Sequence, residues 1–185
     1  MDEPERTVFP VAWLTQYSAE GIRVLTLLGD LQRGEEGCAA TDQELADRLA
    51  MTRNGVNRII LRFEDQDLDW SGLVRSSTTE RGSYAGKRRL VRPVPEGTDL
   101  ITVSAHARDL LRAQLFLVYC ALSQWDGTGQ AVTVARVAAA CNVINHTARK
   151  AIDQLVAGGW VTQTRAPRGL FLYVLDPDGP VSDLS

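Results

Sequence analysis

The feature that most constrains the fold of this chain is a pattern of residue types that occurs twice, in residues 41–60 and 133–152. The copies share few identities, but each begins with a threonine, a residue type that caps helices. Each copy predicts a short capped helix, a tight turn and a second helix, and a repeated pattern marks one structural unit used twice. Corresponding apolar positions, 92 residues apart, are Leu45 and Val137, Ala46 and Ala138, Leu49 and Cys141, Met51 and Val143, Val56 and Ala148, and Ile60 and Ile152.

The composition of the 185 residues is that of a soluble globular protein, with 44% hydrophobic and 23% charged residues. This length predicts one or two small domains. No apolar run reaches the ~18 residues that a membrane span needs. Asp2, Glu3 and Glu5 give the N-terminal segment the wrong charge for a signal peptide. We therefore expect no association with a membrane.

The cysteines indicate a reducing compartment. Cys38, Cys120 and Cys141 are odd in number and widely spaced, so they predict neither a disulfide framework nor a C-x-x-C metal site. We expect buried free thiols, no metal, no cofactor, and a cytoplasmic, nucleoid-associated protein.

The distribution of charge is more informative than its total. The chain has a net charge of −3, and an acidic total speaks against nucleic acid, whose partners are usually basic. Residues 53–92, however, contain nine basic and five acidic side chains, which gives this segment +4 and leaves −7 for the rest. Positive charge is thus concentrated beside the repeated pattern.

Caps and periodicity predict three helices and two strands around the first copy. Ser18 precedes a helix to about residue 32, and Thr41 with Glu44 forms a T-x-x-E capping box for a helix to about residue 50. Thr52 precedes a third helix to about residue 64. Strands are expected at 73–76 and 87–94, around a basic loop rich in Gly, Ser and Thr.

The second copy has the same order. A long helix is predicted from Ser104 to Trp125, Thr133 caps a short helix, and Asn145 caps a helix that stops at Gly158-Gly159. Strands at 160–164 and 170–174 flank a tight basic turn. Pro93, Pro95 and Gly97 indicate a boundary between the copies near residues 95–103.

This order of elements resembles the winged helix-turn-helix superfamily over residues 18–94 and 104–175, above all the modules of bacterial transcription regulators and of plasmid or phage replication initiators. The resemblance implies a mainly α fold with small β-wings (α+β), built as two tandem winged helix-turn-helix domains. The expected organisation is an N-terminal arm (1–17), a first winged-helix domain (18–95), a linker (96–103), a second winged-helix domain (104–176) and a C-terminal tail (177–185).

The third helix of each copy has an outward polar face. At 100° per residue, Val56, Ile60 and Phe63 form the inward stripe, while amides and guanidiniums of the kind that read base edges point the opposite way. The predicted DNA-binding residues of the first copy are Thr52, Arg53, Asn54, Asn57, Arg58 and Arg62, with Arg81, Lys87, Arg88 and Arg89 in its wing. Those of the second copy are Asn145, His146, Thr147, Arg149 and Lys150, with Arg165 and Arg168 in its wing.

No motif indicates an enzyme. Only His106 and His146 are present, and neither belongs to a nucleophile–base arrangement. Gly82 to Gly86 has three residues between its glycines, one fewer than a phosphate-binding loop, and Arg88 stands where a hydroxyl must hold magnesium.

The sequence therefore predicts sequence-specific binding of double-stranded DNA by a bacterial or mobile-element transcriptional regulator. Initiation of plasmid or phage replication is an alternative. A winged-helix protein-interaction scaffold of the chromosome-segregation type is an alternative of another class, because winged helices also bind proteins. The helix from Ser104 and the apolar segment near Trp13 are candidate homodimer surfaces, and no small-molecule ligand is expected.

Overall fold

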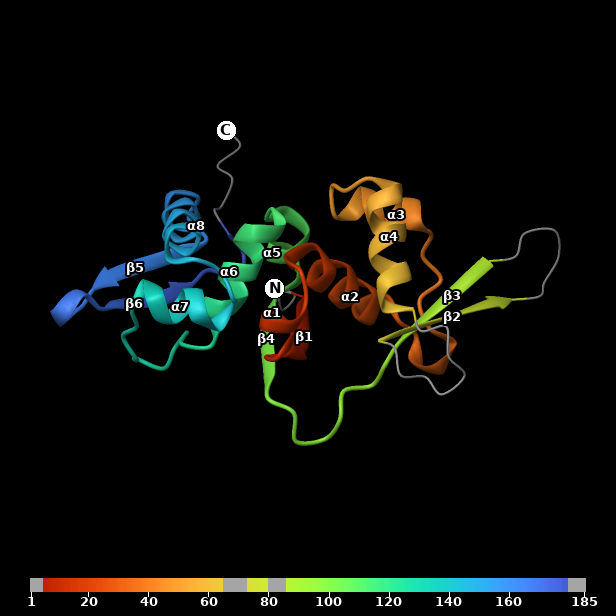
Figure 1. Cartoon of the computed structure of the whole chain (residues 1–185), viewed down its shortest axis with the longest axis horizontal. Helices are drawn as coiled ribbons and strands as arrows, with labels where there is room; N and C mark the ends of the chain where they lie inside the picture. Colours follow the sequence, from red (N-terminus) through yellow and green to blue (C-terminus); the bar gives the residue numbers. More distant parts are fainter. Residues whose placement is uncertain (1–4, 65–72, 80–85, 180–185) are drawn as a thin grey trace. The chain divides into compact units, whose positions relative to one another are not determined.

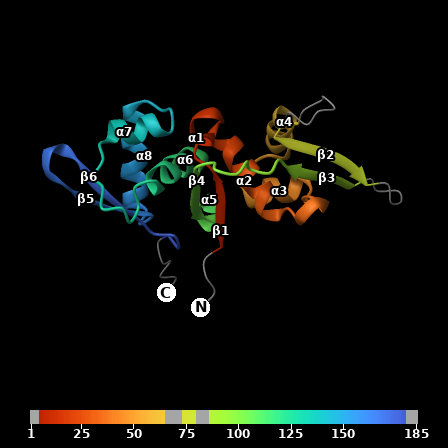
Figure 2. The same cartoon turned by 90° about the horizontal axis from the view of Figure 1, so that it is seen from below.

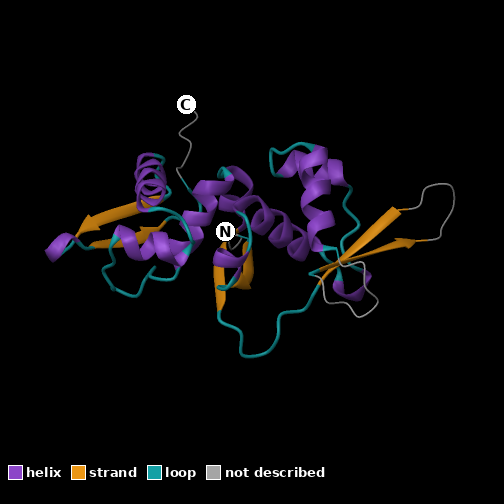
Figure 3. Ribbon diagram, in the orientation of Figure 1, coloured by secondary structure: helices purple, strands orange, loops and turns teal. Residues whose placement is uncertain are grey.

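The computed structural model describes residues 5–64, 73–79 and 86–179. The fold is mixed α+β, with helices and two-stranded antiparallel sheets (Figure 3). The chain divides into two compact units, one of which is interrupted by the other in sequence. We call Arg23–Thr98 the inserted unit, and Met1–Ile22 together with Asp99–Ser185 the split unit. One division falls inside a helix, and the other falls within the 96–103 segment that the sequence marked as a linker.

The inserted unit has helices followed by a hairpin (Figure 1). The hairpin pairs Val74 with Val91 at its base, and Cys38 forms a further antiparallel bridge to Arg89. Leu25, Leu45 and Val56 lie in the core and are fully buried. Its elements are α2 (Ala19–Leu31, which starts in the split unit), η1 (Gly34–Glu36), α3 (Asp42–Arg48), α4 (Arg53–Phe63), β2 (Val74–Thr79) and β3 (Gly86–Val91).

The split unit has the same order after an additional sheet. Its hairpin pairs Val161 with Leu175, and Val132 forms a bridge to Phe171, as Cys38 does to Arg89 in the inserted unit. Its elements are β1 (Arg6–Pro10), α1 (Trp13–Gln16), β4 (Leu100–Ser104), α5 (Ala105–Leu110), α6 (Ala113–Ser123), α7 (Val134–Ala140), α8 (Asn145–Ala157), β5 (Val161–Arg165), η2 (Pro167–Gly169) and β6 (Phe171–Leu175).

The two copies of the pattern share one turn geometry. Ala50 and Asn142, which correspond in the alignment, both have a φ of 50°. The residue after each donates its N–H to a carbonyl five positions earlier, from Met51 to Ala46 at 2.8 Å and from Val143 to Ala138 at 3.0 Å. This left-handed closure of a helix C-terminus satisfies carbonyls that the helix leaves open. The repeat in the sequence therefore corresponds to a repeat in backbone conformation.

Most of the expected helix caps are confirmed. The hydroxyls of Thr41, Thr52 and Thr133 accept backbone N–H groups of the first turns that follow, and Glu44 completes the capping box. The expected cap at Asn145 is wrong, because Asn145 is already the first residue of α8 and the cap position is one residue earlier. Ile144 occupies the cap position without a side-chain bond, which matches Thr52 in the other copy.

The structure differs from the sequence expectation in the N-terminal segment. The expected arm contains β1, which pairs in antiparallel register with β4 from Arg6 opposite Ser104 to Pro10 opposite Leu100 (Figure 2). Part of the expected linker is therefore strand β4. Pairing across this sequence distance leaves no local signal in either strand.

The expected long helix from Ser104 is two helices. Leu111 and Arg112 are extended between α5 and α6, with ψ of 139° and 149°. Neither Pro nor Gly marks this break, so the helical pattern of apolar residues in the sequence runs through it without interruption. Residues Phe116–Leu122 are all buried, as are Trp13 and Leu14. Most of the two candidate homodimer surfaces is thus packed within the chain, although Leu110 is 62% and Val8 is 51% exposed.

Replacing Ala50 by glycine is expected to raise the stability of the inserted unit by up to about 1 kcal/mol. A residue with a Cβ costs about 1–2 kcal/mol in the left-handed region, which exceeds the entropic cost of glycine. Asn142→Gly is the matched control and should gain less, because asparagine tolerates this conformation. Thermal unfolding measures both changes, and a lower melting temperature for Ala50→Gly would contradict the assigned backbone.

Candidate nucleic-acid interface

Helix α4 presents a polar, cationic face to solvent. Arg53, Asn54, Arg58 and Arg62 are exposed, as is the capping Thr52, while Val56 and Ile60 are buried on the opposite side. The first turn has no acidic residue, so the partial positive charge of the helix N-terminus adds to that of the arginines. This face is chemically suited to anions and to base edges.

Asn57 and Arg89, both predicted to bind DNA, are instead bonded to other parts of the inserted unit. Asn57 is half-buried, and its Nδ2 donates to Oδ2 of Asp42 at 3.2 Å. Arg89 is 3% exposed, forms an ion pair with Asp42 and donates from Nη1 to the carbonyl of Ala40 at 3.1 Å. Asp42 therefore ties α4 to the hairpin strand β3.

The expectation that Arg89 contacts DNA does not agree with its position. Its guanidinium is enclosed and already bound by a carboxylate and a carbonyl. Strand β3 instead offers Lys87, which is exposed, and Arg88, which is half-buried. Arg81 lies outside the described residues.

Helix α8 presents the corresponding face in the split unit. Asn145, His146, Arg149 and Lys150 are exposed and Thr147 is half-buried. The opposite side of the helix is packed, with Ala148, Ala151, Ile152 and Leu155 buried. Lys150 and Arg58 hold matched positions in the two copies, and both point to solvent.

A recess joins this helix to the hairpin of the same unit. It has a volume of about 330 Å³ and is lined by residues of α7, α8 and the turn between β5 and β6, including Thr133, His146 and Arg149. Arg165 and Arg168 are exposed on the hairpin, where Arg168 adopts a φ of 62°. The structure thus brings the predicted helix residues and hairpin residues of this copy to neighbouring elements.

Two exposed apolar side chains complete these faces. Leu61 on α4 is 57% exposed and Ile144 at the start of α8 is 70% exposed. Apolar side chains among polar readers are suited to thymine methyl groups. The sequence prediction of Asn145 as the helix cap does not indicate Ile144 at this face, whereas the alignment of Ile144 with Thr52 does.

The three thiols are free and buried, which favours their protonated form. Burial raises the pKa of Cys141 to about 11, and it raises the pKa values of Cys38 and Cys120 as well. A protonated, enclosed thiol is a poor nucleophile and a poor metal ligand. Within residues 5–64, 73–79 and 86–179, no three His, Cys, Asp or Glu side chains are grouped to hold a metal ion. In that same part of the chain, no helix has the length and apolarity to cross a membrane.

No protein-family model matches this chain, and no curated protein matches it. One similar solved structure is that of the DIP2311 protein from Corynebacterium diphtheriae, with 17% sequence identity and a TM-score of 0.28. The match covers 92% of this chain and 28% of that chain, so this chain spans less than a third of the protein it matches. The functional interpretation therefore depends on the site geometry alone.

Proposed function

We propose that each unit contains a winged helix-turn-helix module and that the protein binds double-stranded DNA sequence-specifically, as a transcriptional regulator of a bacterial or mobile-element operon. The observation that carries the proposal is the pair of matched cationic faces on α4 and α8. The order of three helices and a hairpin supports it. So do the bridges of Cys38 and Val132 to the hairpins, since each joins the segment before the second helix of its module to the hairpin by a single β-bridge.

The exposed side chains divide into two roles. Residues on the helix faces read base edges, because amides and guanidiniums form paired hydrogen bonds there. Residues on the hairpins and helix ends bind phosphate and fix the register on the duplex. The proposed readers are Arg53, Asn54, Arg58, Asn145, His146, Arg149 and Lys150, and the proposed phosphate contacts are Thr52, Arg62, Lys87, Arg88, Thr147, Arg165 and Arg168. Asn57 acts by positioning α4 through Asp42.

Arg58→Ala is expected to cost about 1–3 kcal/mol of affinity for the preferred site and to relax its sequence preference. Lys150→Ala, the matched change in the other copy, tests the second module. Arg112→Ala is the control, because Arg112 is exposed but lies outside both faces. Selection from random duplexes followed by anisotropy titration measures preference and affinity. An unchanged sequence preference in both variants would contradict the assignment of Arg58 and Lys150 as base-reading residues.

Two other functions give different outcomes in the same experiment. A replication initiator would select sites that recur within one origin. A protein-interaction scaffold is favoured by the net charge of −3 and by the exposed Leu61 and Ile144, and it would show no duplex binding at low salt. We propose no catalytic role for any residue of these faces.

A further inference from the structure

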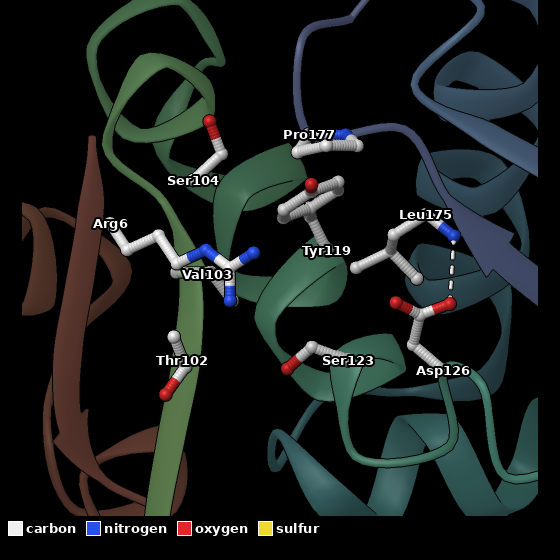
Figure 4. A pocket seen from close by; sticks show the side chains of 9 residues that line it. All are labelled: Arg6, Thr102, Val103, Ser104, Tyr119, Ser123, Asp126, Leu175 and Pro177. Carbon is white, nitrogen blue, oxygen red and sulfur yellow. Dashed lines mark hydrogen bonds between the residues drawn. The ribbon is translucent and has the colours of Figure 1, made fainter. Parts of the chain in front are cut away.

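The split unit contains a second concave site, away from the cationic face of α8. Its volume is about 210 Å³, and it lies between β1, β4, α6 and the segment that follows β6 (Figure 4). Its polar lining comprises Arg6, Thr102, Ser104, Tyr119, Ser123 and Asp126. These residues come from four segments of one compact unit.

Opposite charges face this cavity without neutralising each other. The guanidinium of Arg6 extends from β1 into the cavity (Figure 4), and none of the described carboxylates forms an ion pair with it. On the other side, Oδ1 of Asp126 accepts the N–H of Leu175 at 3.1 Å. The second carboxylate oxygen of Asp126 points toward the cavity (Figure 4). One cationic and one anionic group are thus both available to a ligand.

The hydroxyls between these charges act as acceptors. Tyr119 Oη donates to the carbonyl of Asp176 at 3.2 Å, and Ser123 Oγ donates to the carbonyl of Cys120 at 2.8 Å. Each hydroxyl has one hydrogen, so its remaining capacity is its lone pairs. Burial raises the pKa of Tyr119, which keeps the phenol protonated and this donation intact at neutral pH. The side of the cavity near α6 therefore favours a donor on the ligand.

The size of the cavity limits the ligand. The volume is about 210 Å³. Drug-sized ligands occupy sites of about 300–1,000 Å³, so the occupant is a smaller molecule. Val103, Leu175 and Pro177 supply an apolar wall for a short side chain.

We propose that this cavity binds a small zwitterion, a free α-amino acid with a short side chain. Its carboxylate pairs with Arg6, and its ammonium group pairs with Asp126 and the acceptor oxygens of Tyr119 and Ser123. A simple anion would leave the Asp126 carboxylate facing negative charge, and a simple amine would leave the Arg6 guanidinium facing positive charge. A zwitterion satisfies both ends.

Occupancy would connect the β1–β4 sheet to the helix and hairpin of the same unit. Arg6 belongs to β1, Tyr119 to α6, and Leu175 ends β6. A ligand that binds the folded state raises its stability by mass action, whatever the function of the chain. This inference therefore does not depend on DNA binding, and either one can fail without the other.

The test uses the full chain with glycine, alanine, serine, valine and proline as separate probes, followed by thermal unfolding and titration calorimetry. A saturable rise in melting temperature with at least one free amino acid is expected. N-acetylalanine, alanine methyl ester, acetate and ethylamine, each lacking one charged end, should produce much smaller shifts. No shift and no heat with any of the five amino acids would overturn the proposal, and acetate acting equally well would reassign the site to simple anions.

Variants assign the binding to the cavity. Arg6→Gln and Asp126→Asn should each weaken binding roughly 10- to 150-fold, since each removes one charge-assisted contact. Asp126→Asn keeps an oxygen for the N–H of Leu175, and Ser123→Ala provides a second route if either variant unfolds. Arg112→Gln is the matched control and should bind as the unaltered chain does. Equal affinity in Arg6→Gln, Asp126→Asn and the unaltered chain would place the ligand elsewhere.

Discussion

Raising the salt concentration from 50 to 200 mM is expected to weaken duplex binding roughly 500-fold when both units contact the same DNA. Each phosphate neutralised by a cation contributes about −0.9 to the slope of log affinity against log salt. The cations assigned to phosphate are Arg62, Lys87 and Arg88 in the inserted unit, and Arg165 and Arg168 in the split unit. Five such contacts give a slope of about −4.5.

The slope of log affinity against log salt also shows whether one module or both bind the duplex. The inserted unit alone gives a slope of about −2.7 and the split unit alone about −1.8, which correspond to losses of roughly 40-fold and 12-fold over the same salt range. Replacing a single phosphate-binding residue, such as Lys87→Gln, should reduce the slope by about 1. Arg112→Gln should leave it unchanged. Anisotropy with a labelled duplex across this salt range provides the measurement, and a slope near zero would eliminate the proposal of DNA binding for both faces.

Asp42→Ala is expected to lower the free energy of unfolding of the inserted unit by about 3–5 kcal/mol. The change leaves the buried guanidinium of Arg89 without its carboxylate, and an unpaired buried charge is strongly destabilising. Nε of Arg89 already has no hydrogen-bond partner among the described residues, so no compensating bond is available there. The Nδ2 bond from Asn57 is lost as well, which loosens α4.

A matched change on the same helix separates this effect from loss of surface charge. Asp47→Ala removes an exposed carboxylate that accepts a hydrogen bond from Gln43 on the same helix. This change should alter stability by less than about 0.5 kcal/mol. The double variant Asp42→Ala with Arg89→Met should recover most of the loss, since it removes the buried charge. Denaturant unfolding measures all three. Equal stability of Asp42→Ala and Asp47→Ala would show that the ion pair contributes little.

Local signals in the sequence predicted the local structure. Thr52 and Thr133 cap helices because the bonds they make reach only three residues along the chain. The glycine pair after α8 ends that helix, with Gly159 at a φ of 73°. Outward faces followed from periodicity for the same reason, and Arg58 and Lys150 are exposed as the pattern predicts.

Long-range pairing could not be obtained this way. Arg89 was expected at the DNA surface, but its position depends on Asp42, 47 residues earlier in the chain. Strand β1 depends on β4, and the cavity that joins Arg6 to Asp126 depends on that pairing. The break at Leu111 has no local marker either. Each of these features is set by tertiary packing, which overrides local preference.

The division of the split unit has a consequence for synthesis on the ribosome. Strand β1 emerges about 90 residues before β4, and translation at about 5–20 residues per second leaves it unpartnered for roughly 5–20 s. During this interval the whole inserted unit appears, while Val8 and Phe9 remain in a segment with an open backbone edge. The acidic residues before β1 and Pro10 at its end are of the kind that keeps nascent strands from aggregating.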